Sequence, residues 1–181
     1  MRKFINQLEP MIGVVERRAA SEYLRSGGWL TEFKETARFE QMVAEFLHSK
    51  YVSVVSNGTM SLFLSLTALG IGPGDEVIIP DFTMIASANV ALMAGATPVF
   101  VDIDPYSLCL DLNKVESRLT KRTKALMVVL FNGRAPDMQK VVDFCALHKL
   151  YLVEDAAQAF GSQWGGKNEG ASWSWCWKIS N

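Results

Sequence analysis

Residues 56–59, Ser56-Asn57-Gly58-Thr59, form the first stretch of the sequence whose types and spacing suit a chemical task. They follow a short apolar run at 51–55 and lead straight into a helical pattern. A helix start presents free backbone N–H groups and the positive end of a helix dipole, and Thr59 adds a hydroxyl, which together favour binding of a phosphate. The alternative is an ordinary helix cap, in which Asn57 or Thr59 caps the helix and Gly58 relieves the turn.

A second such stretch is Glu154-Asp155-Ala156-Ala157-Gln158, which follows the apolar run 151–153. A carboxylate at Asp155 points into the crevice at the edge of a sheet and can hold a cationic nitrogen. Gln158, one turn further on, can hydrogen-bond a neighbouring oxygen. The alternative is that Asp155 caps a following helix and that Glu154 is exposed to solvent.

The two stretches together suit one flat, phosphorylated, nitrogen-containing cofactor that lies across the ends of the strands. Pyridoxal phosphate fits this description, because its pyridinium must stay protonated to withdraw electrons and a buried aspartate favours the protonated ring. The glycines Gly70, Gly72 and Gly74 do not form a dinucleotide-binding loop, since they follow a helical pattern and precede a strand.

Helical and strand-like patterns alternate along the chain with short connections, which predicts an α/β fold with a parallel sheet covered by helices. Continuous apolar runs, at 77–79 and 127–130, indicate strands buried on both faces. Because chemistry in such sheets lies beyond the carboxyl ends of the strands, we expect the site at the junctions 56–59, 80–84, 132–134 and 154–158. The expected helices are residues 14–24, 39–47, 62–69, 85–94, 112–119 and 138–148, and the expected strands are 51–55, 76–79, 97–101, 125–130 and 151–153.

The composition is that of an ordinary soluble chain: 181 residues, 49% hydrophobic, 20% charged, with a net charge of −1. This length favours one domain. The near-neutral balance argues against nucleic-acid binding, and no apolar window or signal core suits a membrane, so we expect a cytoplasmic protein. The cysteines Cys109, Cys145 and Cys176 form neither a zinc pattern nor an even disulfide set, so no metal site is expected and Cys145 fits a core thiol.

Six motifs in order along the chain resemble the DegT/DnrJ/EryC1/StrS sugar aminotransferase family, over about residues 28–170. Residues 132–138, Asn132-Gly133-Arg134-Ala135-Pro136-Asp137-Met138, look most like the perosamine-synthase-type members. The six motifs are Gly28-Trp29-Leu30-Thr31, Ser56-Asn57-Gly58-Thr59-Met60-Ser61-Leu62, the stretch from Gly72-Pro73-Gly74-Asp75 to Pro80, Thr83-Met84-Ile85-Ala86-Ser87-Ala88-Asn89, Gly95-Ala96-Thr97-Pro98-Val99-Phe100-Val101-Asp102 and Glu154-Asp155-Ala156-Ala157-Gln158-Ala159.

The resemblance implies the parallel-sheet, three-layer large domain of the fold type I aminotransferases, with pyridoxal 5'-phosphate as cofactor. It implies transfer of an amino group from an amino acid, usually glutamate, to a nucleotide-linked keto sugar in surface polysaccharide biosynthesis. It also implies a homodimer for the complete enzyme, with active sites at the interface, and no nucleic-acid or membrane partner.

Position by position, the resemblance makes Gly58 and Thr59 phosphate contacts, Asp155 the partner of the pyridinium nitrogen, and Gln158 the group near the phenolic oxygen of the cofactor. Met84 departs from the family pattern, in which an aromatic residue commonly stacks on the ring. A methionine can still contact the ring face through its polarizable thioether, though less rigidly. The alternative is that Met84 is a core residue at a helix start.

The resemblance ends after the glycine-rich residues 165–170, before the segment in which the family carries its Schiff-base lysine. Residues 171–181, with Trp173, Trp175 and Trp177, do not match, and Lys178 follows Asp155 too closely to align with that lysine. We therefore expect an N-terminal helical segment at 1–27, a truncated large domain at 28–170 and an aberrant tail at 171–181, with the catalytic residue unassigned. Alternatively, Lys178 serves as the base.

Two classes of function follow: a sugar aminotransferase impaired by truncation, or a non-catalytic remnant with residual cofactor or phosphate binding. A dehydratase variant of the family, with histidine in place of the lysine, is disfavoured because the chain has only His48 and His148, neither near the tail. We assign these two histidines no role.

Overall fold

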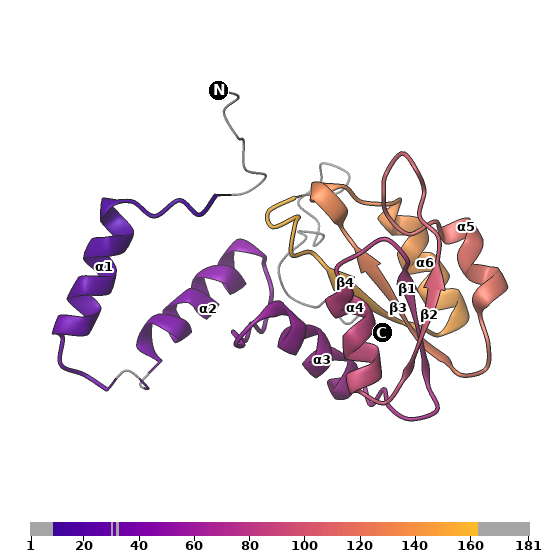
Figure 1. Cartoon of the computed structure of the whole chain (residues 1–181), viewed down its shortest axis with the longest axis horizontal. Helices are drawn as coiled ribbons and strands as arrows, with labels where there is room; N and C mark the ends of the chain where they lie inside the picture. Colours follow the sequence, from indigo (N-terminus) through magenta and orange to yellow (C-terminus); the bar gives the residue numbers. More distant parts are fainter. Residues whose placement is uncertain (1–8, 30, 32, 163–181) are drawn as a thin grey trace, which may run out of the picture. The chain divides into compact units, whose positions relative to one another are not determined.

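The computed structural model describes residues 9–29, 31 and 33–162, which form two compact units. The N-terminal unit ends at Phe39, and the larger unit begins at Glu40. The first holds α1 (Val14–Arg25) and the start of α2 (Lys34–Phe46), and the second holds the end of α2 and all later elements (Figure 1). Both helices were predicted, although α2 begins ahead of the predicted residue 39.

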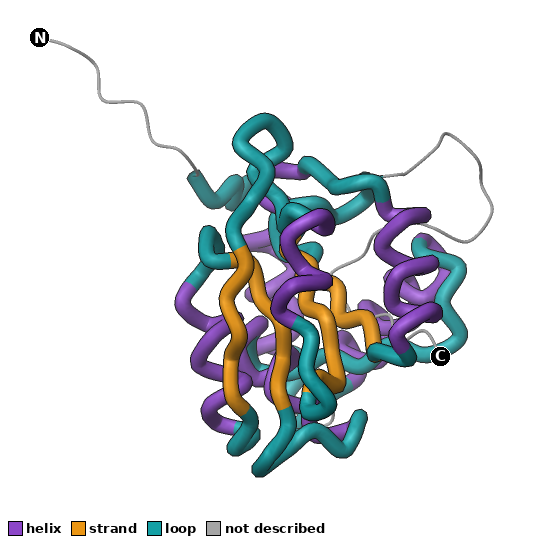
Figure 2. The backbone as a smooth tube through the Cα atoms, turned by 90° about the vertical axis from the view of Figure 1, so that its right-hand side faces the viewer, coloured by secondary structure: helices purple, strands orange, loops and turns teal. Residues whose placement is uncertain are grey.

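A sheet of four parallel strands lies at the centre of the larger unit, as the continuous apolar runs predict. Figure 2 shows the strands side by side, in orange. Their order is β2-β1-β3-β4, so β1 and β3 are central among the described residues. The strands are β1 (Glu76–Pro80), β2 (Thr97–Val101), β3 (Thr123–Val129) and β4 (Tyr151–Asp155).

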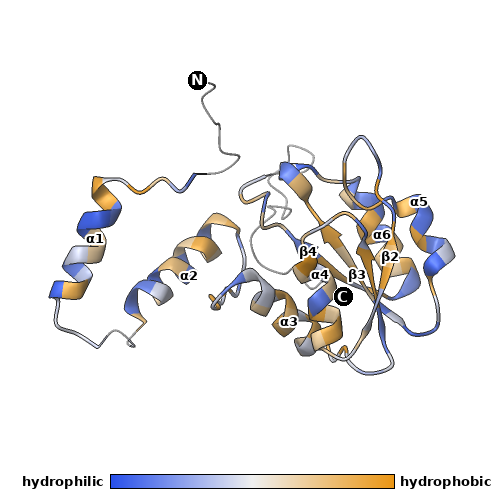
Figure 3. Ribbon diagram, viewed as in Figure 1, coloured by the Kyte–Doolittle hydropathy of each residue, from blue (hydrophilic) through white to orange (hydrophobic). Residues whose placement is uncertain are grey.

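Helices cover both faces of this sheet. Since successive strand residues point to opposite sides, neighbouring residues of one strand are buried against different helices. Val77 and Ile79 are buried with residues of α3 (Gly58–Ala68) and α4 (Ile85–Met93). Ile78 is buried with residues of α5 (Leu112–Val115) and α6 (Met138–His148). The structure is therefore the predicted α/β fold in three layers. Figure 3 shows the central strand β3 in orange, the colour of hydrophobic residues. Two 3₁₀ turns complete it: η1 (Glu116–Arg118), which ends the helix predicted at 112–119, and η2 (Phe131–Gly133).

The strand predicted at 51–55 is wrong. These residues have no regular secondary structure and pair with none of the four strands. Tyr51 and Val54 are exposed, and the Val54 N–H donates to a carboxylate oxygen of Glu40 at 2.7 Å. A β-rich composition describes a fit to a pleated, half-buried surface, and in the described part of the chain this segment meets no such surface.

The amino end of β1 is fixed by a buried acidic side chain. Glu76 accepts hydrogen bonds from the hydroxyls of Thr120, at 2.5 Å, and Thr123, at 3.4 Å, and pairs with Arg122 at 2.5 Å. The Thr120 hydrogen bond is the largest cause holding the pKa of Glu76 below its usual range, with Arg122 adding to it. These contacts lie where the register between β1 and β3 shifts, between Glu76 and Val77.

Cys109 and Cys145 are buried free thiols, which confirms that Cys145 is a core residue. Burial raises the pKa of the Cys145 thiol to about 12 and also raises that of Cys109. Cys176 lies outside the described residues. Among the helices that are described, none is both long enough and apolar enough to cross a bilayer.

Candidate active site

The start of α3 and the end of β4 lie on one face of the sheet at its carboxyl edge. Helix α3 leads through a short connection to the amino end of β1 and packs Leu62 and Leu66 beside Val77, so it runs back along the strands and begins near their carboxyl ends. Val153 of β4 is buried in the same cluster. Because side chains alternate along a strand, Asp155 lies on the same face as Val153 and therefore on the α3 side.

The first turn of α3 has donors to offer a ligand. The Asn57 side chain caps the helix by accepting from the Met60 N–H at 2.9 Å, so the ordinary cap considered above is present. The N–H groups of Gly58 and Thr59 precede any intrahelical acceptor and lie at the positive end of the helix. No acidic residue occurs in this turn, and a Cβ built on Gly58 would meet no atom of the described residues within 4 Å. The cap and an anion site are thus compatible here.

Asp155 is a half-buried carboxyl at the end of β4, level with Val129 of β3. Its Oδ1 accepts from the Ala157 N–H at 3.2 Å. Burial raises the pKa of this carboxyl above its usual range, and the Ala157 hydrogen bond only partly opposes the rise. No helix occurs in the described residues 156–162, so Asp155 does not cap one there, and Glu154 is buried rather than exposed.

Gln158 lies in the turn after β4 and contacts the turn after β3. Its Oε1 accepts from the backbone N–H of Asn132 at 2.8 Å. The sequence marks both junctions as candidate positions but gives no sign of this contact between them. An Asn-Gly pair after a strand does signal a tight turn, because Asn and Gly adopt positive φ most readily, and φ is 53° at Asn132 and 73° at Gly133.

Met84 lies at the start of α4 with 62% of its surface exposed, so it is not a core residue. Beside it in the chain, Phe82 packs on Phe131 with ring centroids 4.7 Å apart and planes inclined by 59°. This aromatic pair joins the loop after β1 to the turn after β3 at the carboxyl edge. The spacing of Phe82 and Phe131 in the sequence gives no sign of this contact.

The residues present fit a pyridoxal-type cofactor in two respects. Among the described residues, Asp155 is a partly buried carboxyl with no cation beside it, and a pyridinium nitrogen would supply one. The open, acid-free start of α3 on the same face suits a phosphate. The segment expected to hold the Schiff-base lysine, together with Lys178 and the tail at 171–181, lies outside the described residues.

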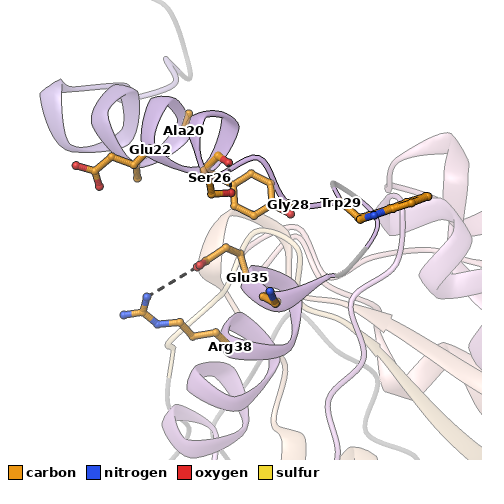
Figure 4. Close-up of a pocket in the computed structure, with 10 residues that line it drawn as sticks. Ala20, Glu22, Ser26, Gly28, Trp29, Glu35 and Arg38 are labelled. Atoms are coloured by element: carbon orange, nitrogen blue, oxygen red, sulfur yellow. Dashed lines mark hydrogen bonds and ion pairs between the residues drawn. The ribbon is translucent and has the colours of Figure 1, made fainter.

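A separate hollow of about 730 Å³ lies within the N-terminal unit. Residues of α1, the following turn and the start of α2 line it, among them Tyr23, Gly28 and Trp29 (Figure 4). An ion pair of 3.8 Å between Glu35 and Arg38 lies at its side. Gly28 and Trp29 belong to a motif quoted above, but nothing in the geometry of this hollow assigns it a ligand.

The larger unit is thus an α/β domain of the aminotransferase type, and the comparisons agree. The model of the DegT/DnrJ/EryC1/StrS aminotransferase family matches residues 10–174, and the chain belongs to this family. It is 43% identical to GDP-perosamine synthase of Vibrio cholerae over 162 residues. The aligned region covers 90% of this chain and 44% of that protein.

Solved structures agree in fold. The crystal structure of 3-amino-5-hydroxybenzoic acid (AHBA) synthase superposes with a TM-score of 0.83 at 36% identity, covering 89% of this chain and 42% of that one. NtdA from Bacillus subtilis, solved with the bound cofactor PMP, superposes with a TM-score of 0.76 at 35% identity, covering 80% and 33%. The chain spans less than half the length of these relatives.

Proposed function

We propose that this chain forms the cofactor-binding part of a pyridoxal phosphate-dependent aminotransferase that moves an amino group from an amino acid to a nucleotide-linked keto sugar. The observation that supports it most is the position of Asp155, a half-buried carboxyl with a raised pKa on the same sheet face as the open start of α3. A relative named GDP-perosamine synthase supports a nucleotide-linked sugar as the acceptor. Glutamate as donor, a role in surface polysaccharide biosynthesis, a cytoplasmic location and a homodimeric assembly belong to the same proposal.

The start of α3 and Asp155 would bind opposite charges of the cofactor, its phosphate and its ring nitrogen. The N–H groups of Gly58 and Thr59 would bind the phosphate, assisted by the positive end of α3. Asp155 would hold a proton on the ring nitrogen, since its carboxylate becomes stable when a cation lies beside it. When bound, pyridoxal phosphate supplies an aldehyde and an electron-withdrawing ring for amino transfer. Met84, exposed at the start of α4, would cover one ring face.

A titration of the full chain with pyridoxal phosphate and with pyridoxamine phosphate, followed by absorbance, tests the binding. We expect saturable binding that Asp155→Asn weakens by about tenfold or more, because a charge-assisted hydrogen bond is lost. Asp143→Asn is the matched control, as Asp143 is exposed on α6 and accepts a hydrogen bond from Gln139, one turn away on the same helix. Equal affinity for Asp155→Asn and the wild type would overturn the proposed role of Asp155.

A second possibility is binding of the cofactor without turnover, because no lysine among the described residues is assigned as the Schiff-base lysine. Borohydride reduction of the chain with pyridoxal phosphate, followed by intact mass and peptide mapping, separates the two functions. A single adduct at Lys178, lost in Lys178→Arg, supports a lysine able to react. Saturable binding with no specific adduct supports binding alone, and no binding in either assay contradicts both.

A further inference from the structure

The hydrogen bond between Asn132 and Gln158 has one possible direction. The backbone N–H of Asn132 is a donor only, so the atom of the Gln158 amide that faces it at 2.8 Å is the acceptor oxygen. The Nε2 group, with its two donors, therefore faces away from the turn after β3. Gln158 is exposed at the carboxyl edge, so this donor end is accessible to a ligand there.

The turn that supplies the N–H is itself held in place. The backbone N–H of Arg134 donates a hydrogen bond to the Phe131 carbonyl at 3.0 Å, which closes the turn. In the loop after β2, the Cys109 Sγ lies 3.5 Å from the carbonyls of both Ser107 and Arg134. The Arg134 guanidinium donates to the Tyr106 carbonyl in the same loop at 3.3 Å. These contacts join the loops after β2, β3 and β4, and the hydrogen bond to Gln158 is the one that reaches the loop after β4.

The geometry of the turn depends on Gly133. Its φ of 73° lies in the left-handed region, which glycine adopts without strain and L residues with a Cβ rarely adopt. A Cβ there would lie 3.6 Å from the Gln158 carbonyl oxygen, which is an ordinary contact, so the strain comes from the backbone φ. An alanine at 133 would therefore tend to displace the Asn132 N–H from the Gln158 side chain.

We infer that the turn at Asn132 and Gly133 is a positioning element, which fixes the Gln158 amide so that its NH₂ donates to an anionic oxygen of the bound ligand. The inference rests on the proposed function for the identity of the ligand, a phosphorylated hydroxypyridine. The turn acts only through Gln158, and its own side chains need not touch the ligand.

Amide hydrogen exchange of the full chain without ligand tests the positioning bond alone. We expect the Asn132 amide to exchange about threefold to tenfold faster in Gln158→Met, which has no acceptor of comparable strength, and to stay protected in Gln158→Glu, which keeps an oxygen. Unchanged exchange in Gln158→Met would overturn the inference whether or not the chain binds a cofactor.

The pH titration of the absorbance of bound pyridoxamine phosphate tests the donor role. Both Gln158→Glu and Gln158→Met should make the ligand phenol about tenfold less acidic, because the donor to its phenolate is lost. Gly133→Ala should move it the same way. Gly70→Ala should not, as Gly70 has the same φ of 73° but lies after α3, at the opposite edge of the sheet.

An ionisation that is the same in the wild type, Gln158→Glu and Gly133→Ala would overturn the inference. A wild-type chain that binds no pyridoxamine phosphate would instead contradict the proposed function, and the exchange experiment would still decide whether the turn positions Gln158.

Discussion

The carboxyl of Asp155 accepts a hydrogen bond from the Ala157 N–H at 3.2 Å, and this bond does not offset the cost of burying its charge. A carboxylate with a raised pKa at the carboxyl edge of a parallel sheet destabilises the chain on its own and becomes favourable when a cation lies beside it. Removing the Asp155 carboxylate should therefore raise the stability of the fold and lower the affinity for the cofactor.

Asp155→Asn should stabilise the chain at neutral pH in the absence of ligand, because it removes a charge that folding buries. The sign follows from linkage: since the pKa is raised in the folded state, the wild type is more stable below the ordinary aspartate range and loses stability as pH rises through the raised pKa. Urea unfolding between about pH 4 and pH 7 should show this loss in the wild type and a smaller one in Asp155→Asn. An asparagine variant less stable at neutral pH would argue that the carboxylate has a structural partner.

Gly58→Asp should also separate folding from binding. An acidic residue in the first turn of α3 favours the helix by about 0.3–1 kcal/mol through the dipole, yet it repels a phosphate at the same point. We expect equal or higher stability by urea unfolding and at least about tenfold weaker binding of pyridoxamine phosphate. Gly58→Ala adds a Cβ into open space without charge and is the control. Similar affinities for both variants would place the phosphate elsewhere.

Glu76→Ala should destabilise the fold by about 1–3 kcal/mol, because the hydroxyls of Thr120 and Thr123 lose their buried acceptor. As the folded pKa of Glu76 is lowered, its contribution is present above the ordinary glutamate pKa and is lost as pH falls through the folded value. Asp102→Asn, which breaks the exposed pair with Lys114, should cost clearly less, because solvent screens that pair. Urea unfolding at pH 7 and at acid pH compares the two, and equal losses at pH 7 would contradict the role given to burial.

Leu66→Ala should cost about 2–5 kcal/mol of unfolding free energy, because Leu66 is fully buried between α3 and the sheet. Leu64, on the same helix, is 45% exposed, and Leu64→Ala should cost clearly less. Chemical denaturation of the two variants measures the difference. A small effect at Leu66 would mean that α3 does not pack on the sheet as described.

The sheet was predictable because its signal is local. Uninterrupted apolar runs such as 77–79 identify strands buried on both faces, and α6 begins and ends where its apolar pattern predicts, at Met138 and His148. The run at 51–55 misled for the same reason: local composition records a fit to a sheet surface and does not reveal whether a partner strand lies beside it.

The candidate site was predictable only in part. Gly58 starts a helix that packs on the sheet and Asp155 ends a strand, so the order of helices and strands places both at the carboxyl edge of the sheet. Because side chains alternate between the two faces along β4, Asp155 then lies on the α3 face. The bond from Asn132 to Gln158 was not predictable, since it depends on two turns that are distant in sequence and on a positive φ at Asn132. Burial of Glu154 likewise depends on what covers its face of the sheet.

The most direct test of the cofactor site is the affinity of the full chain for pyridoxamine phosphate compared with pyridoxamine, in the wild type and in Asp155→Asn. The two ligands differ only in the phosphate, and the two proteins differ only in the carboxylate. We predict saturable binding of pyridoxamine phosphate to the wild type, weakened by about tenfold or more on removal of either group. No binding to the wild type, or binding indifferent to both changes, would contradict a site built from the start of α3 and Asp155.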